Sequence, residues 1–292
     1  MIGKVESIKG KKRKIAWLRV FLSGLVLYFI GIAVLVVTGN PNLFPTAVMI
    51  GNFLMPVTFV AFLYERRHWS RLSLPTTALS FIYGGVGGVL AASILEPIFI
   101  RQLDLTNMFV VGLIEEFVKI IGVLLIARHY KHNAEMDGLI LGAAAGMGFA
   151  ALESTGYAFT AFLESGGSLT ATVVVTLLRG ILSPVGHGTW TAILASVLFR
   201  ESGERHFHIN LKVLGAYLTV VVLHGLWDAV PALISAAMYT GLDVLIGQSV
   251  VGALGLFILW RRWHEARRLQ IEHGLPSAEY TQAEESALGN LQ

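Results

Sequence analysis

The sequence contains no cysteine among its 292 residues. This absence excludes disulfide bonds, a thiol nucleophile and any zinc site with cysteine ligands. Charged residues are also scarce: Asp, Glu, Lys and Arg make up 14% of the chain, against about 25% in ordinary soluble domains. Hydrophobic residues make up 54%. This balance excludes a typical soluble domain and indicates a membrane protein.

Long apolar stretches follow one another along the whole chain. A helix needs about 20 apolar residues to cross the hydrocarbon core of a bilayer. Windows of this kind lie at 16–37, 44–64, 76–100, 108–127, 137–162, 170–199, 212–236 and 242–261. They predict an all-α, polytopic membrane protein built as a bundle of about eight transmembrane helices. Pro184 lies inside the sixth window, where we expect a kink or a tilt.

Basic residues concentrate in alternate connections between these windows. Of the 22 Lys and Arg residues, 18 lie in the amino-terminal segment, in alternate loops or just after the last window. The positive-inside rule therefore predicts that both termini are cytoplasmic. We expect a basic tail at 1–15, a single membrane domain at 16–262 and a polar tail at 263–292. No basic face with interleaved exposed aromatic residues is apparent, so we expect no nucleic-acid partner.

The fourth window carries three charged residues near its middle. An ionised side chain at the centre of a membrane helix costs roughly 2.5–3.5 kcal/mol. Lys119 lies four residues after Glu115 and three after Glu116, so all three side chains share one wedge of the helix. The bland interpretation is a buried ion pair that helps to specify helix packing. However, one lysine cannot neutralise two carboxylates, and the second must be protonated, bind a cation or act as a base.

Glu153, in the fifth window, is predicted to point into the bundle. Gly138, Gly142 and Gly146 recur every four residues there, a spacing that lets membrane helices approach closely. Glu153 lies seven residues past Gly146, on the same face, and Tyr157 follows four residues later. A polar packing contact between Glu153 and Tyr157 is the alternative to a functional role.

The sixth and seventh windows add a second set of polar side chains. Arg179 and His187 are eight residues apart and share one stripe of the sixth window. In the seventh, Asp228 follows His224 by four residues, so it is placed to orient the imidazole. Counted from the outer helix ends, most of these residues lie at similar depth. We therefore expect one polar cavity that collects them together with the three glutamates.

Four sequence segments then resemble the PrsW family of intramembrane proteases, across residues 108–235, which we take as the catalytic core. They read "EEFVK", "DGLILGAAAGMGFAALES", "RGILSPVGHGTWTA" and "HGLWDA". The resemblance implies a bacterial membrane protease that acts on a single-pass substrate such as an anti-sigma factor, and a distant similarity to the CAAX prenyl endopeptidases. The positions that match the family are Glu115, Glu116, Lys119, Glu153, His187, His224 and Asp228. Many relatives have asparagine where this chain has Ser154.

Two mechanisms of peptide hydrolysis fit these residues. In the first, Glu116 activates water with help from a histidine, Glu115 is paired with Lys119, and an imidazole, Lys119 or Arg179 holds the oxyanion. In the second, His187 and His224 bind a zinc-like ion together with Glu153 or Glu116. The sequence leaves the metal open, and we favour the glutamate route from it.

Two other classes of function remain as alternatives. Buried Glu, His and Arg side chains also form the relays of proton- or cation-coupled transporters. A relay needs acids strung across the membrane, whereas here the inner halves of the windows have almost none. A scaffold that only binds another membrane protein would explain the glycine faces but not the surplus of acids.

Overall fold

The computed structural model describes residues 15–67, 70, 72–102, 104–128, 134–203, 206–237 and 241–272. Within these ranges the chain is helical and contains no strand. The predicted basic tail, apart from residue 15, and the part of the predicted polar tail after residue 272 lie outside the described residues. The last helix runs to Glu272, ten residues past the predicted end of the membrane domain at 262.

The described residues form ten α-helices, which make eight helical rods because α3 continues into α4 and α7 into α8 through a short turn. Along the chain the helices are α1 (Ala16–Thr38), α2 (Phe44–Glu65), α3 (Leu74–Ile82), α4 (Gly88–Phe99), α5 (Leu105–Ala127), α6 (Glu135–Glu164), α7 (Leu169–Leu182), α8 (His187–Glu201), α9 (Leu211–Ala237) and α10 (Gly241–Glu272). The π-helical turn η2 (Tyr83–Gly87) joins α3 to α4, and the 3₁₀ turn η3 (Ser183–Val185) joins α7 to α8. The short 3₁₀ turn η1 (Pro41–Leu43) precedes α2.

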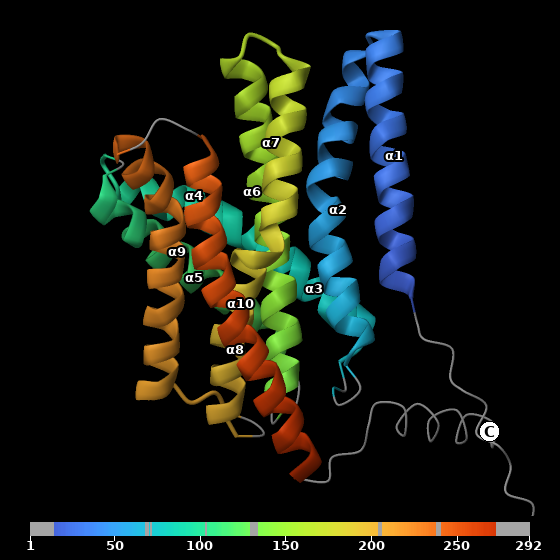
Figure 1. The fold of residues 1–292 in the computed structure, drawn as a ribbon. Coiled ribbons are helices and arrows are strands. Elements are labelled where there is room, and N and C mark those ends of the chain that lie inside the picture. Colours follow the sequence, from blue (N-terminus) through green and yellow to red (C-terminus); the bar gives the residue numbers. More distant parts are fainter. Residues whose placement is uncertain are drawn as a thin grey trace, which may run out of the picture.

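Each rod coincides with one of the apolar windows, so the predicted all-α membrane bundle is confirmed. Of the described helical segments, 7 are long and apolar enough to cross a membrane. The remaining rod is α5, which carries Glu115, Glu116 and Lys119 in its middle. Figure 1 shows that the first residues of α1 and the last residues of α10 lie at the lower ends of these two helices in that view.

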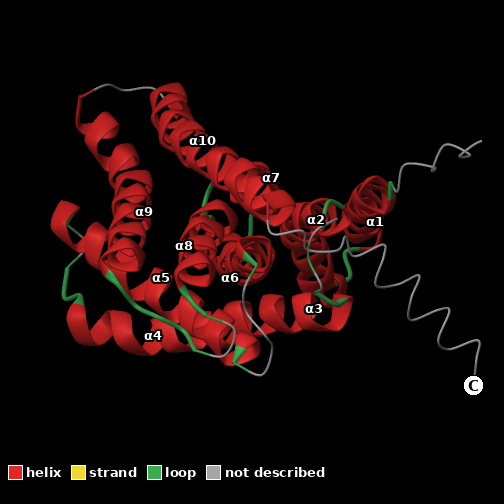
Figure 2. Cartoon of the chain, turned by 90° about the horizontal axis from the view of Figure 1, so that it is seen from below, coloured by secondary structure: helices red, strands yellow, loops and turns green. Residues whose placement is uncertain are grey.

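Helices α6 and α8 form the centre of the fold. Viewed along the bundle, they are surrounded by α3 and α4 on one side, α10 on the opposite side, α1 and α2 at one edge and α9 at the other (Figure 2). Gly138, Gly142 and Gly146 face α8, and a Cβ atom at any of them would overlap a backbone carbonyl of that helix. The glycine spacing therefore has the predicted consequence: the two backbones touch. This contact places the start of α8 beside α6.

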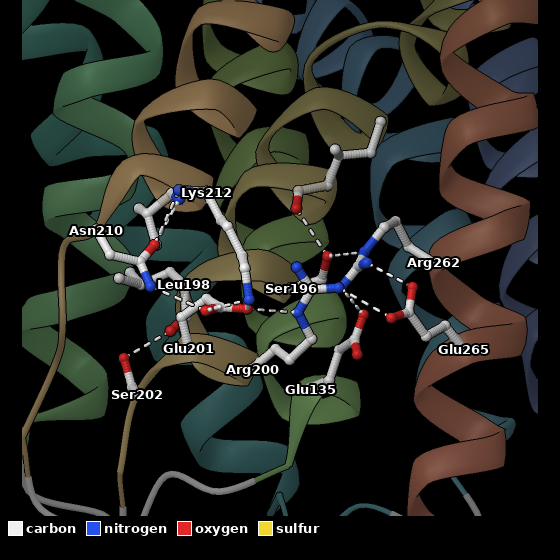
Figure 3. Close-up of polar contacts among 12 residues, drawn as sticks. Glu135, Ser196, Leu198, Arg200, Glu201, Ser202, Asn210, Lys212, Arg262 and Glu265 are labelled. Atoms are coloured by element: carbon white, nitrogen blue, oxygen red, sulfur yellow. Dashed lines mark hydrogen bonds and ion pairs between the residues drawn. The ribbon is translucent and has the colours of Figure 1, made fainter.

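A cluster of charged side chains ties α6, α8 and α10 together far from the glutamates of α5. Its charged members are Glu135, Arg200, Arg262 and Glu265, and the hydroxyl of Ser196 also takes part. The guanidinium of Arg262 donates to Glu135, to Ser196 Oγ at 3.1 Å and to Glu265 Oε2 at 2.6 Å. Arg200 Nη1 donates to Glu265 Oε1 at 2.9 Å. Figure 3 shows these side chains converging between the three helices, so the carboxyl-terminal half of α10 is fixed to the central pair.

Replacing Arg262 by Met is expected to destabilise the protein by roughly 3–5 kcal/mol, because a buried carboxylate loses its cation. The affected group is Glu135, which is 4% exposed. Unfolding in detergent measures the effect, and the exposed Arg261→Met is the matched control. The double variant Glu135→Leu/Arg262→Met should recover most of the loss. An Arg262→Met variant as stable as the control would contradict this role.

Candidate active site

Lys119 of α5 holds both glutamates of the same helix. Its Nζ lies 2.9 Å from Glu115 Oε2 and 2.8 Å from Glu116 Oε1. The predicted pairing of Lys119 with Glu115 is present, but Lys119 also binds Glu116, because positions three and four residues apart are equally within reach of a lysine. The third proton of the ammonium points to His187 Nδ1 at 2.7 Å. All three residues of the α5 wedge are buried.

Glu116 is held by three donors from three helices. Besides Lys119, His224 Nδ1 of α9 lies 3.1 Å from Glu116 Oε1. The hydroxyl of Thr191 in α8 donates to Glu116 Oε2 at 2.9 Å. Sequence reasoning did not identify Thr191, although its position four residues after His187 places both on one face of α8. A carboxylate with all these donors is fixed in place, so it is suited to orienting its neighbours.

His187 reaches the site because the chain breaks at the predicted kink. Helix α7 ends at Leu182, the turn η3 contains Pro184, and His187 is the first residue of α8. Its Nε2 lies 3.0 Å from Glu153 Oε2 on α6. Because the Lys119 ammonium can only donate, His187 Nδ1 must accept, and the ring proton resides on Nε2. His187 therefore donates to Glu153 and presents a lone pair on Nδ1 toward α5.

Arg179 of α7 binds the same oxygen of Glu153 as His187 does. Its Nη2 lies 2.7 Å from Glu153 Oε2, and its Nε donates to Ser154 Oγ at 3.0 Å. The guanidinium also lies over the ring of Tyr157, 4.0 Å from its centroid. Glu153 thus points into the bundle as predicted, where its partners are Arg179 and His187. Ser154, the position at which many relatives have asparagine, supports Arg179 here.

His224 presents a nitrogen to two carboxylates that lie beyond normal hydrogen-bond length. Its Nε2 is 3.6 Å from Glu115 Oε2 and 3.5 Å from Asp228 Oδ2. We expected Asp228 to orient the imidazole, but Glu116 does so by accepting from Nδ1. In the neutral ring, Nε2 then carries a lone pair that faces carboxylate oxygens, an arrangement that a cation between them stabilises. The indole of Trp190 packs against the ring at 4.7 Å between centroids.

Three buried side chains meet the geometric requirements of a metal site. Ligand atoms of Glu115, His187 and His224 all lie within 4.8 Å of one another. Glu115 Oε2 is 3.7 Å from His187 Nδ1 and 3.6 Å from His224 Nε2. Atoms bound tetrahedrally to zinc lie about 3.4 Å apart, so small movements would suffice. The residues therefore fit a metal, with Glu115 beside the two histidines where the sequence suggested Glu153 or Glu116.

The far nitrogen of each imidazole contacts a carboxylate. His187 Nε2 faces Glu153, and His224 Nδ1 faces Glu116. Metal-binding histidines almost always have such a partner, because it fixes the tautomer and the orientation of the ring.

The site residues differ in exposure. The side chains of Glu116 and Lys119 are 0% exposed, whereas those of Arg179 and Asp228 are 30% and 33% exposed. The structure thus brings all eight predicted site residues together, with their more exposed members on α7 and α9.

Comparison with known proteins agrees with this arrangement. A family model described as PrsW family intramembrane metalloprotease matches residues 73–260, a range that includes every predicted site residue. Protease PrsW of Halalkalibacterium halodurans is 28% identical over 180 residues, which cover 60% of this chain and 78% of that protein. No solved structure matches the chain. Neither match supports a transporter. Because the family match covers more than half of the sequence, the chain belongs to the PrsW family of intramembrane metalloproteases.

Proposed function

We propose that the protein hydrolyses a peptide bond of a membrane protein with a zinc ion held by Glu115, His187 and His224. The observation that carries this proposal is the convergence of the three ligand atoms, with an orienting carboxylate behind each imidazole. Such an ion, when bound, supplies a Lewis acid and makes water easier to deprotonate. Three protein ligands and one open position are the usual arrangement of a catalytic zinc.

The other polar residues then have separate roles in the same reaction. Glu116 orients His224, and Glu153, held by Arg179, orients His187. Asp228 lies on the more exposed side of His224, so we assign to it the acceptance of a proton from the attacking water. Glu116, which we favoured as the base from the sequence, is fully buried and already binds three donors. It is therefore better suited to positioning than to proton transfer.

The substrate that we propose is a single-pass membrane protein, such as an anti-sigma factor. This follows from the family resemblance and from a site formed by helices long enough to lie within the bilayer. We also propose that both termini are cytoplasmic, because α1 starts and α10 ends at its lower end in Figure 1, and basic residues concentrate in alternate connections. A carboxyl-terminal reporter that is active only in the cytoplasm tests the orientation.

Chelation is expected to abolish cleavage by the purified full-length protein, and added zinc to restore it. A tagged single-pass membrane protein carrying the transmembrane segment of an anti-sigma factor serves as the probe. Elemental analysis should find about one zinc ion per chain. Full activity after chelation, in a sample that elemental analysis shows to be free of metal, would refute the metal mechanism and favour the glutamate route.

A further inference from the structure

The Lys119 ammonium occupies two of the three atoms that would bind the metal. Its Nζ lies 2.9 Å from Glu115 Oε2 and 2.7 Å from His187 Nδ1, both members of the proposed ligand set. The side chain is 0% exposed, and the ring of Phe149 covers the ammonium at 4.0 Å from its centroid. In this position the Lys119 ammonium is therefore not solvated, and its charge is balanced only by protein groups.

A metal ion cannot share these atoms with the lysine in its present position. An ion about 2.1 Å from both atoms would lie within about 3.1 Å of Nζ, whichever side of them it approached. Two cations at that distance in a buried site repel each other strongly. The ammonium would also lose His187 Nδ1 as an acceptor, because the single lone pair of that nitrogen would then be directed at the metal. The remaining partner within reach is Glu116, whose Oε1 lies 2.8 Å from Nζ.

We propose that Lys119 is a built-in competitor for the metal. In the metal-free protein its single positive charge offsets part of the charge of the two buried carboxylates of α5, so that this helix can insert and pack before any ion arrives. Loading then requires the ammonium to withdraw from Glu115 and His187 and to remain on Glu116. The inference rests on the proposed function, because it concerns the same ligand atoms. It assigns Lys119 a role in metal loading. In the alternative considered from the sequence, Lys119 would stay in place and hold the oxyanion.

Zinc affinity is expected to rise when the competing charge is removed. Full-length wild type, Lys119→Met and Lys119→Arg are purified in detergent, stripped of metal and titrated with zinc against a chromogenic chelator. We expect Lys119→Met to bind zinc at least tenfold more tightly than wild type, and Lys119→Arg not to gain affinity. The exposed Lys212→Met is the matched control and should match wild type. An affinity of Lys119→Met equal to or weaker than that of wild type would overturn the proposal.

Thermal unfolding gives a second readout that does not depend on catalysis. Metal-free Lys119→Met should melt below metal-free wild type, because two buried carboxylates lose their cation, and zinc should raise its Tm more than that of wild type. If Lys119→Met does not fold, Glu116→Gln and Glu116→Gln/Lys119→Met are compared instead. Removing Glu116 together with Lys119 leaves the net charge of the site the same as in wild type. We expect Glu116→Gln/Lys119→Met to bind zinc at least tenfold more tightly than Glu116→Gln. Equal zinc affinities of these two variants would overturn the inference.

The controls also separate this inference from the proposed function. If wild type binds no zinc, or binds it as well as Glu115→Gln does, the metal site itself is wrong. If wild type binds zinc through Glu115 but loss of Lys119 brings no gain, only the competitor role fails.

Discussion

Glu115→Gln is expected to abolish both zinc binding and cleavage, whereas Glu153→Gln should keep zinc at reduced affinity. The two glutamates are the alternatives for the third metal ligand. Glu115 Oε2 lies within 3.7 Å of a nitrogen of each histidine. Glu153 instead contacts the far nitrogen of His187 and the guanidinium of Arg179. Glu115 is therefore the carboxylate placed to bind a metal, whereas Glu153 is placed to orient His187.

The expected magnitudes separate these two roles. Loss of an outer carboxylate typically lowers metal affinity or activity by roughly 10–100-fold. Loss of one of three ligands should exceed the upper end of that range, and we expect Glu115→Gln to fall below detection in a zinc titration. Glu153→Gln should retain about one zinc per chain at saturating metal. The opposite order of affinities would return Glu153 to the ligand set.

Protein level and folding must be controlled for both substitutions. Glutamine keeps the volume of glutamate, so any difference is due to charge and hydrogen bonding. Each variant should accumulate in the membrane and show a cooperative thermal transition in detergent. Asn107→Ala, at the start of α5 and away from the site, is a control for substitutions in this helix.

Sequence patterns alone were sufficient to predict the helices. Apolar length sets the number of rods, because the bilayer fixes how many residues a helix needs. The glycines of α6 indicate close packing against another helix. Pro184 marks the break after α7, which allows His187 to begin a new helix beside the site. Each of these properties is local to its own segment, so no knowledge of neighbouring helices is required.

The choice of ligand could not be read in the same way. Glu115 and Glu116 are adjacent, so their side chains point about 100° apart around α5. Adjacent residues lie at almost the same depth, and only the rotation of α5 against α8 and α9 decides which one lies near a nitrogen of both histidines. That rotation depends on packing between distant segments. The contacts from Thr191 to Glu116 and from Arg179 to Glu153 join residues 75 and 26 positions apart, so they follow only from the folded chain.

Glu116→Gln is expected to lower cleavage at least 100-fold, even though Glu116 binds no metal in our proposal. The carboxylate accepts hydrogen bonds from Lys119, Thr191 and His224, all of which can donate. A glutamine amide has one acceptor oxygen and an NH₂ group, so only one end of the side chain can still accept, and the Thr191 hydroxyl must reverse its role and accept from the NH₂ group. The lost charge also leaves Glu115 as the only α5 carboxylate available to Lys119. Both effects disturb the orientation of His224 and the position of Glu115.

Thr191→Val is the matched comparison, because it removes one hydrogen bond to Glu116 and keeps the shape of the side chain. A hydrogen bond to a charged group contributes about 1.5–3 kcal/mol, so we expect a loss of cleavage of roughly tenfold to a hundredfold, smaller than that of Glu116→Gln. Zinc binding should survive in both variants and be weakened in Glu116→Gln by roughly 10–100-fold. Cleavage by purified Glu116→Gln at the rate of wild type would contradict the proposal that Glu116 orients His224. Complete loss of zinc from Glu116→Gln would instead place Glu116 among the ligands.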